Sequence, residues 1–415
     1  MRLTRARMRT STLTAVAALA TAATLATTSA AGGATLPAND PFYTVPSGLK
    51  HVANGTILKS RTVKVSADGA PLPVRAWQLE YKTLDVNKKP TAMVTTLLVP
   101  TAPWTGKGPR PVVSYQFAED GASTACAPSY ALAAGAASLE TESNASTETQ
   151  LLDPLIKKGW ALAIPDYEGP GSYFFSAAEE AHGVLDGIRA AIHFKPAGFS
   201  AKSPVALMGY SGGGYATAVA VLAQAKYAPK LHLTAAAIGS PAVSVTAELK
   251  AFSGGIGGGA IAMAIAALER AYPKANLGRY LNAAGKSAVE ESSQACLIQS
   301  AEQHPFANIA SWEATPDALQ APAVVAFLQS ISPEYMPGRP IIPVLEYHDR
   351  DDEFAPLANA LATVAKWCAR GATVDQVTQP GGEHIEFESV GQPIAIKYLT
   401  ARFAGQSTPD TCPRK

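Results

Sequence analysis

The sequence has little charge for its length. Of 415 residues, 16% are Asp, Glu, Lys or Arg and 47% are hydrophobic, and the formal net charge is +1. Disordered chains combine few apolar residues with much charge, so this composition excludes a largely disordered protein. No block of Lys or Arg occurs beyond the first ten residues, which argues against binding of nucleic acid through phosphate neutralisation. We expect a globular protein with a large core and no nucleic-acid partner.

Long apolar runs are also absent. No segment reaches the roughly 18 uninterrupted apolar residues that indicate a membrane-spanning helix. Residues 13–26 are apolar but rich in Thr, follow four arginines, and precede small residues at positions 29–31. This combination is typical of a secretory signal peptide. We predict a signal peptide at residues 1–30 and a secreted mature chain without a transmembrane segment.

Cysteine is scarce as well. None of the four cysteines has a partner at the two-residue spacing of a zinc knuckle, so we expect no metal site. An even number of cysteines in an exported protein predicts two disulfides, for which three connectivities are possible. The cysteines are Cys126, Cys296, Cys368 and Cys412.

Apolar, β-branched runs alternate with helical patterns along the chain. The predicted strands are residues 62–65, 74–81, 92–99, 111–115, 160–165, 205–209, 233–239, 341–347 and 374–378. The predicted helices are residues 151–158, 177–194, 213–226, 357–370 and 394–403. This alternation predicts an α/β fold with a mostly parallel central sheet, helices on both faces, and an antiparallel start where the first strands follow one another directly.

One long segment interrupts the alternation. Residues 241–340 are rich in Gly and Ala and have helical patterns, and predicted sheet strands lie on both sides of them. We therefore expect a helical cap or lid inserted into a core that comprises residues 40–240 and 341–412.

The strongest chemical signal follows the predicted strand of residues 205–209. Residues 209–213 read Gly-Tyr-Ser-Gly-Gly, which is a G-x-S-x-G motif between a buried strand and a helix. The glycines let the chain turn sharply, and this turn exposes the serine hydroxyl, as in α/β-hydrolases. The N-terminus of the following helix favours developing negative charge beside it. We predict that Ser211 is a nucleophile.

A serine nucleophile needs a base, which in α/β-hydrolases follows it in the chain. His384 lies after the last predicted strand and, by pattern, on a turn before the final helix, where the base is expected. We assign surface or structural roles to the other downstream histidines, His232, His304 and His348. His384 is therefore the predicted base.

The base in turn needs an orienting carboxylate. The loop that begins at residue 348, after the strand of residues 341–347, has several candidates. Asp352 lies four residues before Pro356, a common spacing for the acid of such sites, so we predict Asp352. Asp349 and Asp351 remain alternatives, and we expect the unused carboxylates to be solvated or paired with Arg350.

The oxyanion of a tetrahedral intermediate needs N–H donors. Gly212, the residue after the nucleophile, is one candidate. The second donor is expected in the loop after the strand of residues 111–115, where Asp120 precedes Gly121. The His-Gly-Gly signature of many esterases is absent from this loop, so the residues alone leave the second donor open, with Asp120 as a candidate.

Several segments resemble the secretory lipases of the Candida lipase A type. They are Val113-Ser114-Tyr115-Gln116 with Glu119-Asp120, Cys126-Ala127-Pro128-Ser129-Tyr130, Leu185-Asp186-Gly187-Ile188-Arg189-Ala190, the G-x-S-x-G motif, Tyr227-Ala228-Pro229, Asp352 to Pro356, and Glu383-His384. The resemblance spans residues 40–412. It implies an α/β-hydrolase core with a helical cap over the acyl site, and a serine esterase that acts on lipid esters.

The resemblance also implies specific roles for residues. The catalytic triad would be Ser211, Asp352 and His384, and the oxyanion donors would be the N–H groups of Asp120 and Gly212. The implied disulfides are Cys126–Cys296 and Cys368–Cys412.

We therefore expect a secreted, monomeric triacylglycerol lipase or carboxylesterase that forms an acyl-enzyme and needs no cofactor. A serine peptidase of the same fold is disfavoured, because no anchor for a peptide N-terminus is evident; the intact Ser, Asp and His disfavour a non-catalytic binding protein. Lipase and esterase remain open alternatives, as do acyl chain length and action at a lipid–water interface. The cap residues expected to line an acyl tunnel or to pack inside the cap are Ile256, Ile261, Met263 and Ile265.

Overall fold

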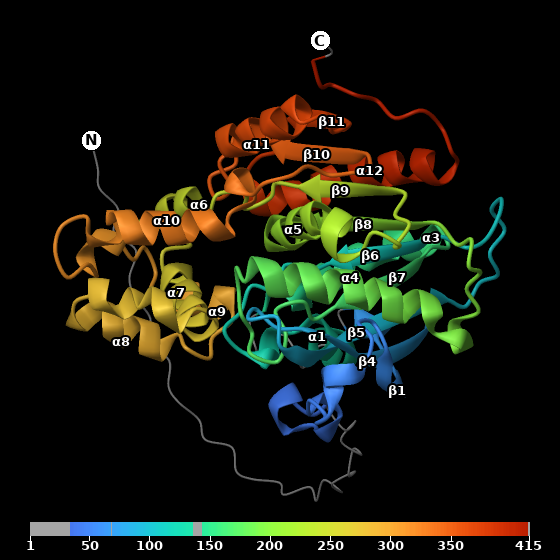
Figure 1. Cartoon of the computed structure of the whole chain (residues 1–415), viewed down its shortest axis with the longest axis horizontal. Coiled ribbons are helices and arrows are strands. Elements are labelled where there is room, and N and C mark those ends of the chain that lie inside the picture. Colours follow the sequence, from blue (N-terminus) through green and yellow to red (C-terminus); the bar gives the residue numbers. More distant parts are fainter. Residues whose placement is uncertain (1–33, 68, 136–142, 414–415) are drawn as a thin grey trace, which may run out of the picture. The chain divides into compact units, whose positions relative to one another are not determined.

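A nine-stranded sheet forms the centre of the computed structural model, which describes residues 34–67, 69–135 and 143–413 (Figure 1). Its strand order is β1-β4-β5-β7-β6-β8-β9-β10-β11. The strands are β1 (Ile57–Val63), β4 (Val74–Leu84), β5 (Pro90–Pro100), β6 (Val112–Gln116), β7 (Ala161–Pro165), β8 (Val205–Tyr210), β9 (Ala235–Gly239), β10 (Val344–Asp349) and β11 (Val374–Gln379). β2 (Ser66–Ala67) and β3 (Ala70–Pro71) form a separate two-stranded sheet. The predicted signal peptide lies outside the described residues.

The sheet changes from antiparallel to parallel along its width. The pairs β1–β4, β4–β5 and β5–β7 are antiparallel. The pairs β6–β7, β6–β8, β8–β9, β9–β10 and β10–β11 are parallel. This confirms the predicted mostly parallel sheet with an antiparallel start. Because the carboxyl ends of parallel strands share one edge, the loops after β6, β8 and β10 are brought to the same edge of the sheet.

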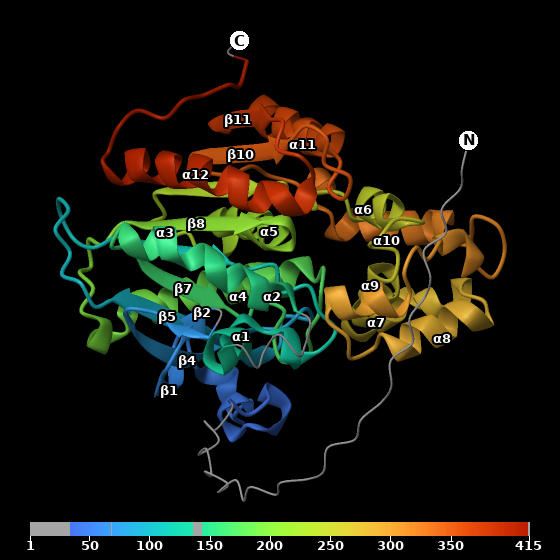
Figure 2. The ribbon, with the colours of Figure 1, turned by 180° about the vertical axis from the view of Figure 1, so that it is seen from behind.

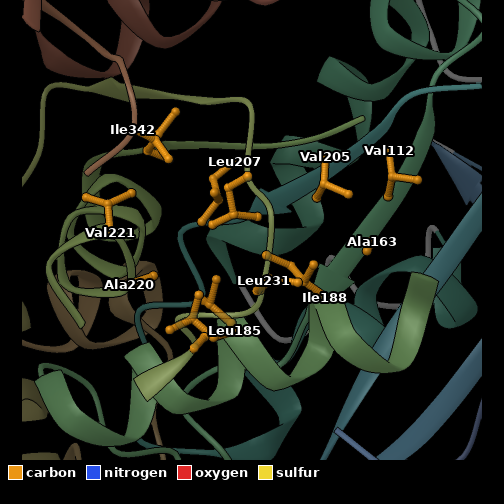
Figure 3. Packing of buried hydrophobic residues seen from close by; sticks show 14 of the residues in the cluster. Val112, Ala163, Leu185, Ile188, Val205, Leu207, Ala220, Val221, Leu231 and Ile342 are labelled. Atoms are coloured by element: carbon orange, nitrogen blue, oxygen red, sulfur yellow. The ribbon is translucent and has the colours of Figure 1, made fainter. Parts of the chain in front are cut away.

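Helices cover both faces of the sheet, as predicted. In Figure 1, α4 (Ala177–His193) and α5 (Ser211–Tyr227) lie in front of the strands; in Figure 2, α3 (Leu152–Lys157) and α12 (His384–Phe403) lie in front. Side chains of β8 alternate between the two cores: Leu207 packs with α4 and α5, whereas Met208 packs with α3 and α12. A parallel sheet buried on both faces has this near-continuous apolar sequence. Figure 3 shows the first core, where Leu185 and Ile188 of α4 lie near Leu207.

The remaining helices include five in the segment of residues 241–340, hereafter the helical insertion. These are α6 (Val245–Phe252), α7 (Ala260–Ala271), α8 (Ala283–Glu291), α9 (Leu297–Gln303) and α10 (Pro322–Ile331). Outside it are α1 (Pro128–Ala134), α2 (Asn144–Glu148) and α11 (Leu357–Ala369). The short 3-10 helices are Pro37–Asn39, Pro41–Tyr43, Leu49–His51, Thr124–Cys126, Thr149–Leu151, Lys195–Ala197, Pro273–Ala275, Leu277–Tyr280, Ile309–Ser311, Ala318–Gln320 and Pro333–Tyr335.

The helical insertion lies between β9 and β10 in the chain, and it has a hydrophobic cluster separate from the two cores of the sheet. The buried side chains of α7 pack with those of α6, α8 and α10 and with Tyr215 of α5. No helix in the described part of the chain combines the length and apolar character needed to cross a bilayer. Residues 241–340 are thus a helical segment between two adjacent strands of the sheet.

Two elements differ from the sequence prediction in ways that matter for the site. Helix α12 begins at His384, not after residue 393, because the Glu383 side chain accepts hydrogen bonds from the N–H groups of Ile385 and Glu386. Pro393 lies inside this helix, although proline usually interrupts a helix. The sequence pattern therefore predicted a start after Pro393, which is wrong. Strand β10 extends to Asp349, which places residues 348 and 349 in the strand rather than in the following loop.

Two disulfides link distant parts of the chain. Cys126 is joined to Cys296 of the helical insertion, and Cys368 of α11 is joined to Cys412 near the C-terminus. This is the pairing that the family resemblance implied.

Candidate active site

Ser211 lies at the sharp turn between β8 and α5. It is the first residue of α5 and has a positive φ of 53°, an unusual conformation for a residue other than glycine. The turn leaves no room for side chains beside it: a Cβ atom at Gly209 would overlap the main chain of Gly213, and one at Gly213 would overlap the carbonyl of Gln116. The glycines of the motif are therefore required by close main-chain approach, as the sequence reasoning expected.

His384 connects Ser211 to Asp352. Its Nε2 lies 2.7 Å from the Ser211 Oγ, and its Nδ1 lies 2.7 Å from the Asp352 Oδ2. A carboxylate at Nδ1 holds the ring proton on that nitrogen, so Nε2 is left free to accept the serine proton. The structure thus brings together three residues that the sequence placed 32 and 173 positions apart.

The two oxygens of the Asp352 carboxylate have different hydrogen-bond partners. Oδ1 accepts hydrogen bonds from the N–H groups of Phe354 (3.0 Å) and Ala355 (2.7 Å), and Oδ2 faces His384. Burial raises the pKa of Asp352, but the hydrogen bond and charge of His384, together with the charge of His348, outweigh burial and hold that pKa below its usual value. Asp352 is therefore ionised and oriented toward the imidazole.

His384 is also held through its main chain. The Tyr210 hydroxyl donates a hydrogen bond to the carbonyl of His384 (2.7 Å), and the N–H of His384 donates to the Glu353 carboxylate (3.0 Å). The His384 side chain is buried. The residue before the nucleophile and the residue after the acid thus both fix the position of the base.

The buried pair of His348 and Glu346 was not predicted from the sequence. His348 Nδ1 lies 2.8 Å from Glu346 Oε1, and Nε2 lies 2.8 Å from the carbonyl of Ala355. Burial lowers the pKa of His348, but the hydrogen bond and charge of Glu346, and then the charge of Asp352, raise it above the usual value. Both ring nitrogens of His348 face acceptors, an arrangement that favours the protonated imidazole behind Asp352. No sequence signal marked this pair beyond a histidine at a strand end.

The alternative acids lie elsewhere. Asp349 is buried in β10 and accepts a hydrogen bond from the N–H of Asp351 (2.6 Å), whereas the Asp351 side chain is exposed. The expectation that unused carboxylates are solvated or paired with Arg350 is therefore wrong for Asp349, because β10 extends two residues further than predicted.

The two candidate oxyanion donors belong to residues in contact. A Cβ atom at Gly212 would overlap the Asp120 carboxylate, so only glycine allows Asp120 to lie this close. Gly212 is the second residue of α5, and the first N–H groups of a helix have no partner within it. Asp120 is buried, has a positive φ of 36°, and accepts a hydrogen bond from the Asn144 amide (2.9 Å). Burial raises its pKa to about 6.

The apolar residues expected to line an acyl tunnel separate into three groups. Ile256 is 67% exposed, Ile261 and Met263 are buried in the core of the helical insertion, and Ile265 lines a cavity. This cavity measures about 270 Å³ and lies between α6, α7 and α10. Its other apolar lining residues include Leu249, Leu268, Leu277, Val324 and Leu328.

Aromatic contacts connect the helical insertion to His384. The ring of Phe354 lies 5.5 Å from the imidazole of His384 and 4.9 Å from the ring of Phe252 on α6.

Within the described residues, no three His, Cys, Asp or Glu side chains are grouped to hold a metal ion. The groups that meet at Ser211 are thus a hydroxyl, an imidazole, a carboxylate and main-chain N–H donors, which is the set needed for acyl transfer.

Solved structures share this arrangement of elements. The X-ray structure of Candida antarctica lipase A superposes with a TM-score of 0.82 and 28% sequence identity, covering 92% of this chain and 89% of that one. The rice cell wall degrading esterase of Xanthomonas oryzae superposes with a TM-score of 0.63 at 20% identity over 85% of this chain and 97% of that one, which shows the fold alone. Both comparisons confirm the predicted α/β-hydrolase fold.

Sequence comparisons extend over most of the chain. Lipase 10 of Candida albicans is 32% identical, covering 92% of this chain and 84% of the relative. A secreted triacylglycerol lipase of Malassezia furfur is 31% identical, covering 91% and 81%. A Mycobacterium tuberculosis protein named "Probable inactive lipase" is 34% identical, covering 90% and 84%. The model of the family described as secretory lipase matches residues 135–411. The chain therefore belongs to the secretory lipase family and is a lipid ester hydrolase by that membership.

Proposed function

We propose that the protein is a secreted serine hydrolase that cleaves carboxylic esters of lipids, a triacylglycerol lipase or carboxylesterase, through an acyl-enzyme on Ser211. The observation that carries the proposal is the continuous hydrogen-bonded chain from Ser211 through His384 to Asp352 at the carboxyl edge of the sheet. The same hydrogen bonds support catalytic activity in this protein, although one of its relatives is named as inactive.

The first step is acylation. His384 Nε2 accepts the proton of Ser211 as Oγ attacks the ester carbonyl, and Asp352 stabilises the imidazolium that forms. The carbonyl oxygen becomes an oxyanion, which the N–H groups of Gly212 and Asp120 bind. Removal of one such donor typically lowers kcat by about 10² to 10³. The protonated His384 then gives its proton to the departing alcohol, and the acyl group stays on Ser211.

The second step is deacylation. Water attacks the acyl-enzyme, and His384 accepts a proton from this water as the new C–O bond forms. The tetrahedral intermediate collapses, the carboxylic acid leaves, and the proton returns from His384 to Ser211. The reaction balances as ester plus water to acid plus alcohol.

The helical insertion is proposed as the cap over the acyl site. The apolar cavity between α6, α7 and α10 supports this role, because apolar cavities of a few hundred Å³ suit small apolar ligands. Phe252 and Phe354 link the wall of α6 to His384. Ile265, which lines the cavity, is the predicted acyl contact that this proposal keeps.

Export is part of the same proposal. The signal-peptide pattern at residues 1–30 predicts secretion, and two disulfides are typical of an oxidising compartment. The relative from Malassezia furfur is named as a secreted lipase.

A substrate series tests the proposal and separates lipase from esterase. Hydrolysis of triglycerides from tributyrin to triolein is compared with soluble p-nitrophenyl esters, below and above the solubility limit of each. We expect hydrolysis of emulsified triglycerides. A rate confined to soluble short esters would refute the lipase form, and no hydrolysis of either class would refute the proposed function.

A further inference from the structure

The loop that carries Asp120 is joined to the helical insertion through main-chain hydrogen bonds. The N–H of Leu297 donates to the carbonyl of Asp120 (3.0 Å), and the N–H of Ala122 donates to the carbonyl of Ala295 (2.9 Å). Between them, Gly121 and Cys296 form an antiparallel bridge. Segments more than 170 residues apart are thus paired as in a short sheet.

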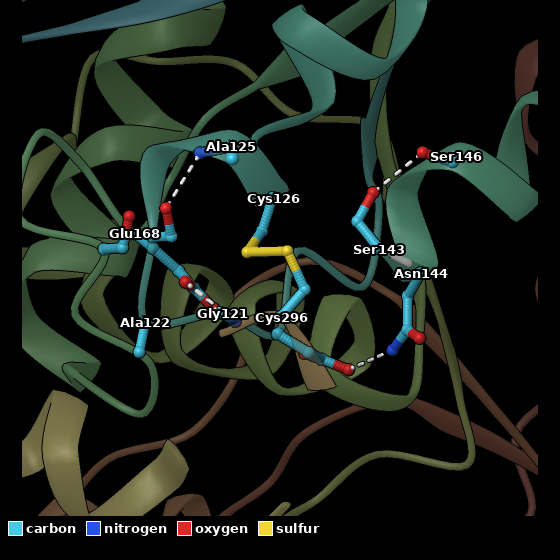
Figure 4. Close-up of a disulfide and its surroundings, with 12 residues drawn as sticks. Gly121, Ala122, Ala125, Cys126, Ser143, Asn144, Ser146, Glu168 and Cys296 are labelled. Atoms are coloured by element: carbon cyan, nitrogen blue, oxygen red, sulfur yellow. Dashed lines mark hydrogen bonds between the residues drawn. A yellow bond between two sulfur atoms is a disulfide. The ribbon is translucent and has the colours of Figure 1, made fainter. Parts of the chain in front are cut away.

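The Cys126–Cys296 disulfide links the same two segments. Figure 4 shows it beside Gly121 and Ala122. A Cβ atom at Gly121 would lie 2.5 Å from the Cys126 sulfur, so the main chain packs directly on the disulfide. Arg270 of α7 adds a further contact, because its guanidinium donates to the carbonyl of Ala122 (2.7 Å).

These contacts act on a strained residue. Asp120 has a left-handed φ, which a non-glycine residue keeps only when its surroundings hold it there. On one side its carboxylate lies against Gly212; on the other its carbonyl accepts from Leu297. With both flanks fixed, the direction of the Asp120 N–H is fixed as well.

We propose that the helical insertion positions the oxyanion hole, with Leu297 and Cys296 as positioning residues that act through the main chain of Asp120. This inference rests on the proposed function of Ser211 and Asp120, and it gives the insertion a role in the chemical step in addition to covering the acyl site. Neither positioning residue needs to touch the substrate.

Leu297 offers a sharp test because it is the first residue of α9. Proline is well tolerated at this position, since the N–H there has no partner within the helix, and the preceding Cys296 already has an extended main chain. Leu297→Pro removes the hydrogen bond to Asp120, whereas Leu297→Ala removes the same leucine side chain and keeps the N–H. The pair isolates one hydrogen bond.

The readout is the division of the effect between kcat and KM for a short p-nitrophenyl ester. A donor that shifts by a fraction of an ångström loses transition-state binding, so we expect Leu297→Pro to lower kcat about tenfold or more relative to Leu297→Ala, with KM within about twofold. Equal kcat values for the two folded variants would overturn the inference.

A second pair of variants keeps the inference testable if Leu297→Pro does not fold. The double variant Cys126→Ala/Cys296→Ala opens the disulfide at the Asp120 loop, and Cys368→Ala/Cys412→Ala opens the one that links α11 to the C-terminal segment. Both lose a disulfide, so both lower the unfolding temperature.

At a temperature where both double variants are folded, we expect only Cys126→Ala/Cys296→Ala to lose kcat, by about tenfold, because only that disulfide holds the oxyanion loop. Equal kcat values in the two double variants would overturn the inference and leave the proposed function intact. Ester hydrolysis that persists in the Ser211→Ala variant would instead contradict the proposed function.

Discussion

At the scale of single residues, the position of Asp352 depends on a small set of neighbours. The N–H groups of Phe354 and Ala355 bind one carboxylate oxygen, so the other oxygen faces His384. The hydrogen bond and charge of His384 hold the pKa of Asp352 below its usual value, and the charge of His348, which lies 3.5 Å from that second oxygen, adds to this effect. Burial alone would have favoured a neutral carboxyl group at this place.

Replacement of Asp352 by Asn tests this arrangement. Asp352→Asn removes the charge that stabilises the imidazolium and allows the wrong ring tautomer, so we expect kcat for ester hydrolysis to fall by about 10³ to 10⁴. Asp351→Asn is the matched control, because Asp351 is the neighbouring, exposed carboxylate. A larger loss in the control than in Asp352→Asn would move the acid to another residue.

At the scale of elements, the turn from β8 to α5 fixes Ser211. Gly209 packs on the main chain of Gly213, and Gly213 packs on the main chain of Gln116, so neither glycine accepts a side chain. Hence the motif could be predicted from the sequence with its context: the buried strand, the glycines and the following helix are all local features.

A methyl group at Gly209 should disrupt this turn. In Gly209→Ala the Cβ atom would overlap the main chain of Gly213, and we expect a loss of about 1–3 kcal/mol in the free energy of unfolding together with lower kcat. Gly255→Ala is the control, since the nearest atom to its Cβ would lie 3.5 Å away. Urea unfolding monitored by fluorescence checks both variants, and equal stabilities would contradict the steric account.

Elements with strong patterns were predicted well, and those with mixed patterns were not. Buried runs such as residues 205–209 needed no tertiary information. Strand β1 begins at Ile57, five residues before the predicted strand, because its exposed polar side chains hide the alternation. The start of α12 was missed because Pro393 lies within the helix and the true N-cap, Glu383, is not the type of residue that usually caps a helix.

At the scale of the whole molecule, buried carboxyl groups make stability depend on pH. Glu179 is buried, and its Oε1 has no hydrogen-bond partner among the described residues. Burial raises its pKa to about 8, although the N–H of Val86 counteracts part of this effect. An unfolded Glu titrates at about 4.3, so the folded state binds more protons between these two pH values. Stability from this group is complete below about pH 4 and is lost as the pH rises through 8.

Glu179→Gln removes this titration and keeps an acceptor for Val86. We expect the free energy of unfolding of the wild type, relative to the variant, to fall by a few kcal/mol between about pH 5 and pH 8. Chemical denaturation at several pH values measures it. A difference between the two proteins that stays constant with pH would show that Glu179 is ionised throughout.

Contacts between distant segments could not be predicted from the residues alone. The bridge between Gly121 and Cys296 and the hydrogen bond from the Asn144 amide to Asp120 depend on how the fold brings these segments together. No local periodicity marks such contacts. The resemblance to a known family implied the disulfides and a link from the oxyanion-loop region to the cap through Cys126–Cys296, but not the main-chain hydrogen bonds between the same segments.

The central claim is that Ser211 is the nucleophile, and covalent labelling tests it most directly. Intact-mass measurement follows wild type and Ser211→Ala after reaction with diethyl p-nitrophenyl phosphate, which phosphorylates activated serines. We predict one added diethylphosphoryl group on the wild type, mapped to Ser211 by peptide analysis, with parallel loss of ester hydrolysis, and none on Ser211→Ala. Equal labelling of both proteins, or a label on another residue that accompanies inactivation, would contradict the account.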